Sequence, residues 1–133
     1  MLFQSRIGFG AGPVSGLMTG SDILIQERTL TAAIEGGVDW IDTAAGYGAG
    51  QSETNLGRCL ANLGIPGRIR IATKVRLTPD QLSCPLTAVR RSLEASLQRL
   101  RIHSCDLLYL HNAVTRETGE QPASLSLLCS NRP

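Results

Sequence analysis

Short apolar runs alternate with amphipathic helical patterns along most of the chain. Four runs have the length and composition of buried strands: Arg6–Phe9, Val38–Asp42, Ile69–Val75 and Cys105–Leu110. Between successive runs, apolar residues recur every three or four positions, as they do on one face of an α-helix. A strand–helix repeat of about thirty residues is typical of right-handed βαβ units, whose strands lie side by side in a parallel sheet. The sequence therefore predicts an α/β fold with about four βα units and a parallel sheet.

The first expected helix runs from about Ile25 to Glu35. Its apolar face carries Leu30, Ala33 and Ile34. Gly36 and Gly37 are expected to end it, because glycine adopts the left-handed backbone conformation that closes many helices.

The second expected helix follows the loop Thr43–Gln51, with Ser52 as its N-cap and Glu53 near the positive end of its dipole. The third begins after Ser83 and Pro85. The apolar stripes of these two helices are Leu56, Cys59, Leu60 and Leu63, and Leu86, Val89, Leu93, Leu97 and Leu100. The polar segment Ala113–Pro133 is expected to be a loop, which places a domain boundary between residues 112 and 113.

Composition favours a globular domain, because 42% of the 133 residues are hydrophobic and 18% are charged. The net charge of +2 and the absence of a basic stripe with aromatic residues argue against a nucleic-acid partner. No run reaches the roughly 20 apolar residues that span a membrane, and the N-terminus does not resemble a signal peptide. The four cysteines and two histidines are too scattered for a metal site, so we expect no metal and a reducing, cytoplasmic location.

Polar residues stand where the expected strands end. Asp42 ends the second strand, Lys74 lies near the end of the third, and His111 follows the fourth, while Tyr47 lies in the loop after Asp42. Parallel α/β folds bind ligands at the carboxyl ends of their strands. Because side chains alternate between the two faces of a strand, the Asp, the Lys and the His can converge on one side of the sheet.

The chemistry of such a cluster suits the reduction of a carbonyl. A lysine ammonium beside a phenol favours the phenolate, so Tyr47 becomes a better proton donor, and Asp42 keeps Lys74 charged. His111 can donate a hydrogen bond to the oxygen of the substrate. The next residue, Asn112, is predicted either to contact substrate or cofactor or to cap its loop. In the glycine-rich stretch after the first strand, Gly10 can let the backbone approach a ligand.

Other interpretations exist for each of these residues. Singly, each is more often a turn, surface or core residue, and four such coincidences at one sheet edge have roughly one chance in ten. The loop Gly46–Gly50 lacks the GxGxxG pattern of a dinucleotide-binding turn. Lys74 could instead serve as the nucleophile of a Schiff-base aldolase.

Several segments resemble landmarks of the aldo-keto reductases. These are Ile41–Gly48, Ser52–Glu53 with Leu56–Gly57, Ala72–Val75, Leu110–Asn112, and the helical stretch Arg91–Leu100. The resemblance implies a (β/α)₈ TIM barrel and reversible reduction of an aldehyde, ketone or sugar carbonyl with NADP, or with NAD.

The resemblance also assigns roles to the four polar residues. Tyr47 is the general acid/base, Lys74 and Asp42 tune it, and His111 orients the substrate, with Tyr47, His111 and Asn112 as substrate contacts. Gly10 and Asp42 are the candidate cofactor contacts within this chain.

A TIM barrel needs eight strands and roughly 250 residues, whereas four strands are expected here. We therefore expect a partial barrel, the truncated N-terminal half of the family fold, with weak cofactor binding and self-association through exposed strand edges. The alternative is a non-catalytic family member that acts as a binding or regulatory module.

Overall fold

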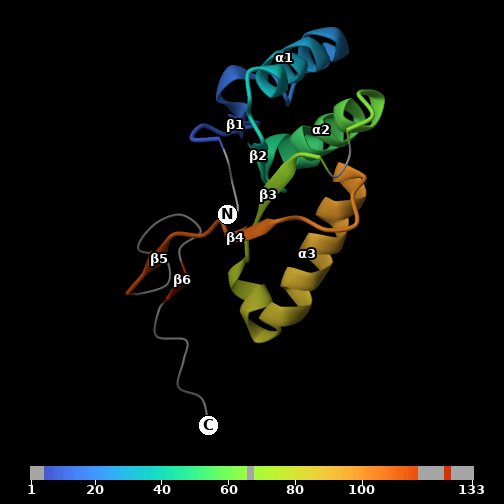
Figure 1. Cartoon of the computed structure of the whole chain (residues 1–133). Helices are drawn as coiled ribbons and strands as arrows, with labels where there is room; N and C mark the ends of the chain where they lie inside the picture. Colours follow the sequence, from blue (N-terminus) through green and yellow to red (C-terminus); the bar gives the residue numbers. More distant parts are fainter. Residues whose placement is uncertain (1–4, 66–67, 117–124, 127–133) are drawn as a thin grey trace.

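The computed structural model describes residues 5–65, 68–116 and 125–126. Its centre is a parallel sheet in the order β1–β2–β3–β4 (Figure 1). The strands are β1 (Phe9–Gly10), β2 (Trp40–Asp42), β3 (Arg70–Val75) and β4 (Leu107–Leu110). The helices α1 (Ile23–Glu35), α2 (Gln51–Asn62) and α3 (Pro85–Leu100) connect them, together with the 3-10 turns η1 (Pro13–Ser15), η2 (Tyr47–Gly50) and η3 (Pro79–Ser83). The predicted α/β fold with four parallel strands is confirmed.

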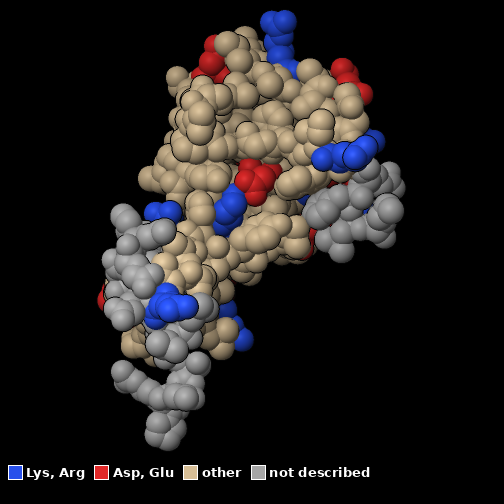
Figure 2. All heavy atoms as spheres, turned by 90° about the vertical axis from the view of Figure 1, so that its left-hand side faces the viewer, with Lys and Arg blue, Asp and Glu red and all other residues tan. Residues whose placement is uncertain are grey.

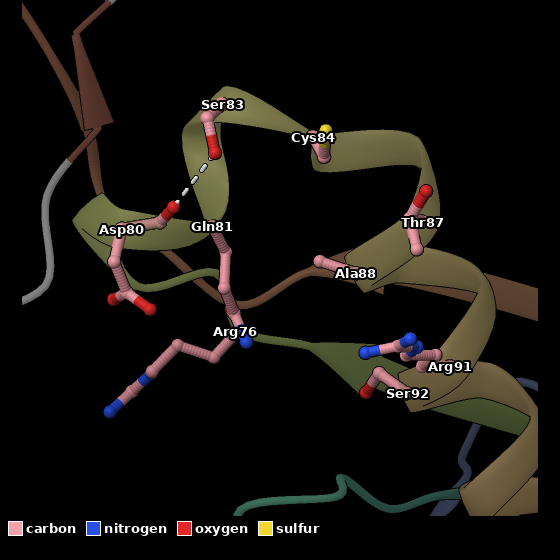
Figure 3. A pocket seen from close by; sticks show the side chains of 9 residues that line it. All are labelled: Arg76, Asp80, Gln81, Ser83, Cys84, Thr87, Ala88, Arg91 and Ser92. Atoms are coloured by element: carbon pink, nitrogen blue, oxygen red, sulfur yellow. Dashed lines mark hydrogen bonds between the residues drawn. The ribbon is translucent and has the colours of Figure 1, made fainter.

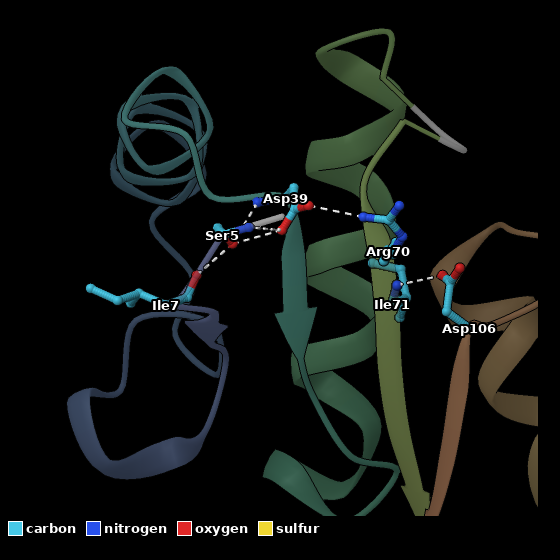
Figure 4. A network of polar contacts seen from close by, with 6 residues as sticks. All are labelled: Ser5, Ile7, Asp39, Arg70, Ile71 and Asp106. Atoms are coloured by element: carbon cyan, nitrogen blue, oxygen red, sulfur yellow. Dashed lines mark hydrogen bonds and ion pairs between the residues drawn. The ribbon is translucent and has the colours of Figure 1, made fainter. Parts of the chain in front are cut away.

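The strands are shorter than predicted at their amino-terminal ends. Around these ends, side-chain hydrogen bonds add to the backbone bonds from Arg70 to Asp39 and from Asp106 to Ile71 (Figure 4). Ser5 Oγ donates to Asp39 Oδ1 at 2.6 Å, and Arg70 Nη1 donates to Asp39 Oδ2 at 2.9 Å. Asp106 Oδ2 accepts the backbone N–H of Ile71 at 2.8 Å. The carboxylates of Asp39 and Asp106 therefore reinforce the backbone hydrogen bonds where the strands begin.

The first helix begins two residues earlier than predicted. Asp22 is its N-cap, and its carboxylate accepts the N–H of Ile25 at 3.0 Å. The helix ends at Glu35, followed by Gly36 and by Gly37 with φ +93°. The predicted helix end is confirmed, but only Gly37 adopts the left-handed conformation, since Gly36 has φ −72°.

The N-cap prediction for the second helix is wrong. Gly50, with φ +92°, occupies the cap position of α2, and no side chain caps the helix. Ser52 lies inside the first turn and is buried. Its Oγ donates to the carbonyl oxygen of Ala11 at 2.7 Å and lies 3.0 Å from Thr43 Oγ1. The hydroxyl thus ties α2 to the segments that follow β1 and β2.

The two helices α2 and α3 pack closely on one face of the sheet (Figure 1). Gly57 permits this approach, since a Cβ atom there would lie 2.4 Å from the carbonyl oxygen of Arg99. The buried residues of the main core come from the sheet, the helices and the first loop: Ala11, Met18, Leu30, Ile41, Leu56, Cys59, Leu60, Ile69, Ile71 and Leu100.

The opposite face of the sheet is less covered. Tyr109 of β4, which is paired with Lys74 and shares its face, is 45% exposed. Seen from the side away from α2 and α3, charged residues are sparse, and an acidic and a basic group lie side by side near the middle (Figure 2). None of the helices in the described ranges is long and apolar enough to cross a membrane.

The segment after β4 contains some regular structure. Val114–Thr115 (β5) pairs in parallel with Leu125–Ser126 (β6). The prediction of a loop is therefore wrong for these four residues. The other residues beyond Arg116 to which that prediction applies lie outside the described part of the chain.

Candidate active site

The Lys74 side chain is the centre of a polar cluster at the carboxyl ends of β2 and β3. Its Nζ donates to Asp42 Oδ2 at 2.6 Å and to the carbonyl oxygen of Thr43 at 2.9 Å. A third hydrogen bond, 3.2 Å long, reaches the hydroxyl oxygen of Tyr47. The structure therefore brings together the aspartate, the tyrosine and the lysine that the sequence singled out.

The strand register explains this convergence. Asp42 is paired with Ala72, and Lys74 lies two residues further along β3 on the same face. Lys74 is in turn paired with Tyr109, so His111, two residues further along the next strand, also comes to this face. The predicted alternation of side chains is confirmed.

An unusual turn places Tyr47 over the strand ends. The three residues after it have left-handed backbone conformations, with φ of 58° at Gly48, 53° at Ala49 and 92° at Gly50. A left-handed alanine costs roughly 1 to 2 kcal/mol, so packing must hold the turn. Its end is closed by Arg99, because a Cβ atom on Gly50 would lie 2.9 Å from Arg99 Cδ.

His111 completes the cluster from the other side of Tyr47. The two rings make an edge-to-face contact, with centroids 5.6 Å apart and an interplanar angle of 82°. Burial lowers the pKa of His111 below its ordinary value of 6.5, and the positive charges of Lys74 and Arg76 lower it further. A neutral imidazole can donate one hydrogen bond from its N–H without competing with Tyr47 as the proton donor.

Asn112 is used by the protein backbone. Its Oδ1 accepts the N–H of Leu77 at 2.9 Å, and its Nδ2 donates to the carbonyl oxygen of the same residue at 2.8 Å. The side chain is 9% exposed. This pairing favours the loop-capping alternative over contact with a substrate.

Gly10 leaves room beside the cluster. It is paired with Asp42 across β1 and β2, is exposed, and has no other atom within 4 Å of the place where a Cβ would stand. A flat ring could therefore approach the backbone beside the Asp42–Lys74 pair. These residues fit the reacting end of a nicotinamide cofactor, and Gly10 and Asp42 would lie against it.

The cluster does not suit Schiff-base catalysis. That chemistry needs an uncharged amine with a free lone pair, whereas Lys74 Nζ donates to three neighbouring oxygens. The Asp42 carboxylate, at 2.6 Å, is the closest of these three acceptors.

Sequence reasoning missed two features of this region. The carbonyl oxygen of Thr43 is a third acceptor for Lys74, and a backbone atom leaves no residue-type signal. Glu53 lies in the first turn of α2 as expected, but it is also fully buried, where its carboxylate accepts from Thr73 and Arg99. Its partners lie 20 and 46 residues away, so no local pattern could reveal them.

Known proteins with the same architecture identify the family. The sequence profile of the aldo/keto reductase family matches residues 6–123. The chain belongs to the aldo-keto reductase family. Its sheet of four parallel strands is accordingly part of the (β/α)₈ barrel of that family.

Individual relatives show how far the match extends. The chain is 36% identical over 112 residues to the aldo-keto reductase YhdN of Bacillus subtilis, covering 80% of this chain and 34% of that protein. It is 32% identical over 112 residues to L-galactose dehydrogenase of Arabidopsis thaliana, covering 81% and 34%. A crystal structure of an aldo-keto reductase from Klebsiella pneumoniae in complex with NADPH is similar with a TM-score of 0.65 and 28% identity, covering 79% and 34%. The chain thus spans about a third of the length of these aldo-keto reductases.

Proposed function

We propose that this aldo-keto reductase chain supplies the proton-donating part of a site that reduces an aldehyde, a ketone or a sugar carbonyl. The observation that carries the proposal is the position of Lys74 Nζ, 2.6 Å from the Asp42 carboxylate and 3.2 Å from the Tyr47 hydroxyl. The electron donor would be NADPH or NADH. The relative crystallised with NADPH supports the cofactor, and the plant relative named for L-galactose supports a sugar carbonyl.

The reaction assigns one role to each side chain. A nicotinamide, when bound, would supply the hydride for the carbonyl carbon. The Tyr47 hydroxyl gives its proton to the carbonyl oxygen, so that the product is an alcohol and Tyr47 is left as a phenolate. Lys74 stabilises this phenolate through its direct hydrogen bond, and Asp42 holds the ammonium in place. Solvent then returns a proton to Tyr47.

His111 acts on the substrate and not as the acid. Its lowered pKa keeps the ring neutral near pH 7, so its N–H is available to the carbonyl oxygen while the proton comes from Tyr47. The edge-to-face contact with Tyr47 sets the direction of both groups. A carbonyl oxygen between the two would receive two donors.

The experiment measures NADPH oxidation with a panel of aldehydes and sugars. The 133-residue chain is assayed alone and after co-expression with the part of the Bacillus subtilis relative that lies beyond the matched segment, which offers the remaining barrel units. We expect turnover in the complemented sample and a loss of 100-fold or more in Tyr47→Phe, since general acid catalysis contributes about 10²- to 10⁴-fold. Tyr109→Phe is the matched control, and its turnover should stay within about twofold.

Two outcomes would contradict the proposal. One is a complemented Tyr47→Phe variant that turns over as fast as the unaltered sequence. The other is a complemented sample that binds NADPH but reduces no carbonyl, which would favour a binding or regulatory module.

A further inference from the structure

The loop between β1 and α1 is fixed to the helices by two buried amide side chains. Asn55 Nδ2 donates to the carbonyl oxygens of Met18 and Gly20, both at 2.8 Å. Gln26 Nε2 donates to the carbonyl oxygens of Leu17 and Gly20, both at 2.9 Å. Asn55 and Gln26 are 1% and 0% exposed, so both amides depend on these acceptors for their hydrogen bonds. This part of the loop is therefore held in one position.

Thr19 lies between the two carbonyl groups that Asn55 binds, and its methyl group contacts the turn that carries Tyr47. A Cβ atom built on Gly48 would lie 2.9 Å from Thr19 Cγ2 and 3.2 Å from Gln51 Cβ. Gly48 has a left-handed backbone with φ 58°. Thr19 and Gln51 therefore both pack against the first left-handed residue of the turn.

Gln51 connects the same turn to Asn55. Its backbone N–H donates to the carbonyl oxygens of Tyr47 and Gly48, and its side-chain amide donates to Asn55 Oδ1 at 3.0 Å. Asn55 is thus hydrogen-bonded both to the loop after β1 and to the residue that closes the turn. Because the turn holds Ala49 in a left-handed conformation that its Cβ disfavours, it needs such contacts to keep its shape.

The direction of the Tyr47 phenol depends on the position of this turn. The ring lies beside the loop after β1, since a Cβ atom built on Gly12 would be 3.8 Å from Tyr47 Cε2. Its hydroxyl lies 3.2 Å from Lys74 Nζ, and its edge-to-face contact with His111 has centroids 5.6 Å apart. Lys74 and His111 belong to the sheet side of the site, so a shift of the turn would move the phenol away from both.

We propose that Thr19 is a positioning residue for the general acid: its methyl group, held in place by Asn55, keeps the turn in the conformation that directs the Tyr47 hydroxyl at Lys74 and at the substrate. Thr19 acts through Gly48 and not on the substrate. The inference rests on the proposed function, because that function makes Tyr47 the proton donor.

The kinetic test compares two substitutions of Thr19 in the complemented sample. Thr19→Ser removes the methyl group and keeps the hydroxyl, whereas Thr19→Val keeps a methyl group and removes the hydroxyl. We expect kcat to fall about tenfold in Thr19→Ser, because a small displacement of a reacting group is costly in rate. KM should stay within about twofold, since the substrate contacts are retained. Thr19→Val is the conservative variant and should retain most of the turnover.

Thr87→Ser is the matched control, because it makes the same chemical change at a different place. Thr87 is an exposed residue of α3 and lines a pocket of about 400 Å³ between η3 and α3 (Figure 3). The residues that line this pocket all lie between Arg76 and Ser92, so none of them belongs to the turn. Thr87→Ser should therefore leave kcat unchanged.

Asn55→Asp tests the support of Thr19 by the loop. The substitution keeps the shape of the side chain and removes the two donors to the carbonyl oxygens of Met18 and Gly20. We expect kcat to fall as it does in Thr19→Ser, and the double variant to lose less than the product of the two single losses, because both act through one contact. If Asn55→Asp does not fold, the two Thr19 variants decide the question.

An NMR measurement on the 133-residue chain is independent of turnover. A background with Tyr109→Phe and His103→Gln leaves one tyrosine and one histidine, since the chain has two of each. The nuclear Overhauser effect between the rings of Tyr47 and His111 then reports their contact. Thr19→Ser should lose this signal, and Thr19→Val should keep it.

The two measurements separate this inference from the proposed function. An unchanged ring contact in Thr19→Ser, or equal losses of kcat in Thr19→Ser and Thr19→Val, would overturn the positioning role and leave Tyr47 as the proton donor. If Tyr47→Phe turns over as fast as the unaltered sequence, the proposed function fails, and the positioning of a proton donor fails with it.

Discussion

The two faces of β3 carry two different charged clusters. On one face, Lys74 joins Asp42 and Tyr47, with 15% and 31% of the lysine and aspartate side chains exposed. On the other face, Thr73 donates to Glu53 Oε1 at 2.6 Å, and Arg99 Nε donates to Glu53 Oε2 at 2.7 Å. Neighbouring residues on one strand thus take part in an open cluster and in a closed one.

The difference in burial between the two clusters indicates which of them stabilises the fold and which is accessible to a ligand. Glu53 is fully buried and both of its oxygens are bound, so its charge joins α2, α3 and β3 and has no capacity left for a ligand. In the open cluster the Tyr47 hydroxyl accepts from Lys74 and can still give its own proton. We expect the closed cluster to determine stability and the open one to determine reactivity.

Replacing Glu53 should have the largest effect. Glu53→Ala leaves the Arg99 guanidinium, which is 30% exposed, without its carboxylate partner, so we expect the lower end of the roughly 3 to 5 kcal/mol that breaking a fully buried pair costs. Urea denaturation of the purified variant measures the loss in the free energy of unfolding. Glu94→Ala, at an exposed position of α3, is the control and should stay within about 0.5 kcal/mol. A loss below about 1 kcal/mol in Glu53→Ala would show that the closed cluster is not structural.

Adding a methyl group at Gly57 should cause the second largest loss of stability. Gly57→Ala places a Cβ 2.4 Å from the carbonyl oxygen of Arg99 and pushes apart the helices that enclose the Glu53 cluster. Overpacking of this kind costs about 1 to 3 kcal/mol. The same denaturation experiment measures it, with Ala61→Ser on the exposed side of α2 as the control. An unchanged stability would mean that the helices can separate without disturbing Glu53.

Removing the charge of the open cluster should matter little for folding. In Lys74→Met the Asp42 carboxylate keeps contact with solvent, and partly exposed pairs contribute about 0 to 1 kcal/mol. The loss in the free energy of unfolding is therefore expected to be well below that of Glu53→Ala. Equal losses in the two variants would erase the distinction between the two faces of β3.

The smallest expected effect concerns pH. Lys74→Met should raise the pKa of His111, because the lysine charge is, after burial, the next cause of its lowering. In the unaltered chain the pKa of His111 is lower in the folded state than in the unfolded state. The contribution of the neutral His111 ring to the free energy of unfolding is therefore full above about pH 6.5, and it is lost as the pH falls through the folded-state pKa. NMR titration in a His103→Gln background measures the pKa directly. A pKa that does not move in Lys74→Met would place the ammonium too far away to influence the imidazole.

The placement of Asp42, Lys74 and His111 could be predicted because it depends on a simple rule. Side chains alternate along a strand, and parallel strands present their carboxyl ends at one edge. The contact between Tyr47 and Lys74 is expected from the chemistry of the cluster and from the family resemblance, but the strand rule does not give the turn that makes it. That turn depends on the left-handed conformation of Ala49, which its residue type disfavours.

Other errors have a non-local cause. Ser52 satisfies the local rule for an N-cap, but its hydroxyl binds Ala11, 41 residues earlier in the chain. The predicted strands include apolar residues that have no partner in the sheet. The hydrophobic patterns therefore predict where a strand or helix lies more accurately than they predict the residue at which it begins or ends.

The two hydrogen bonds between the Asn112 side chain and the Leu77 backbone join the loop after β3 to the loop after β4. A mutation that shifts the backbone of one loop should therefore also shift the backbone of the other. Directed evolution of substrate range in this chain would gain more from libraries that vary both loops simultaneously than from scanning either one separately.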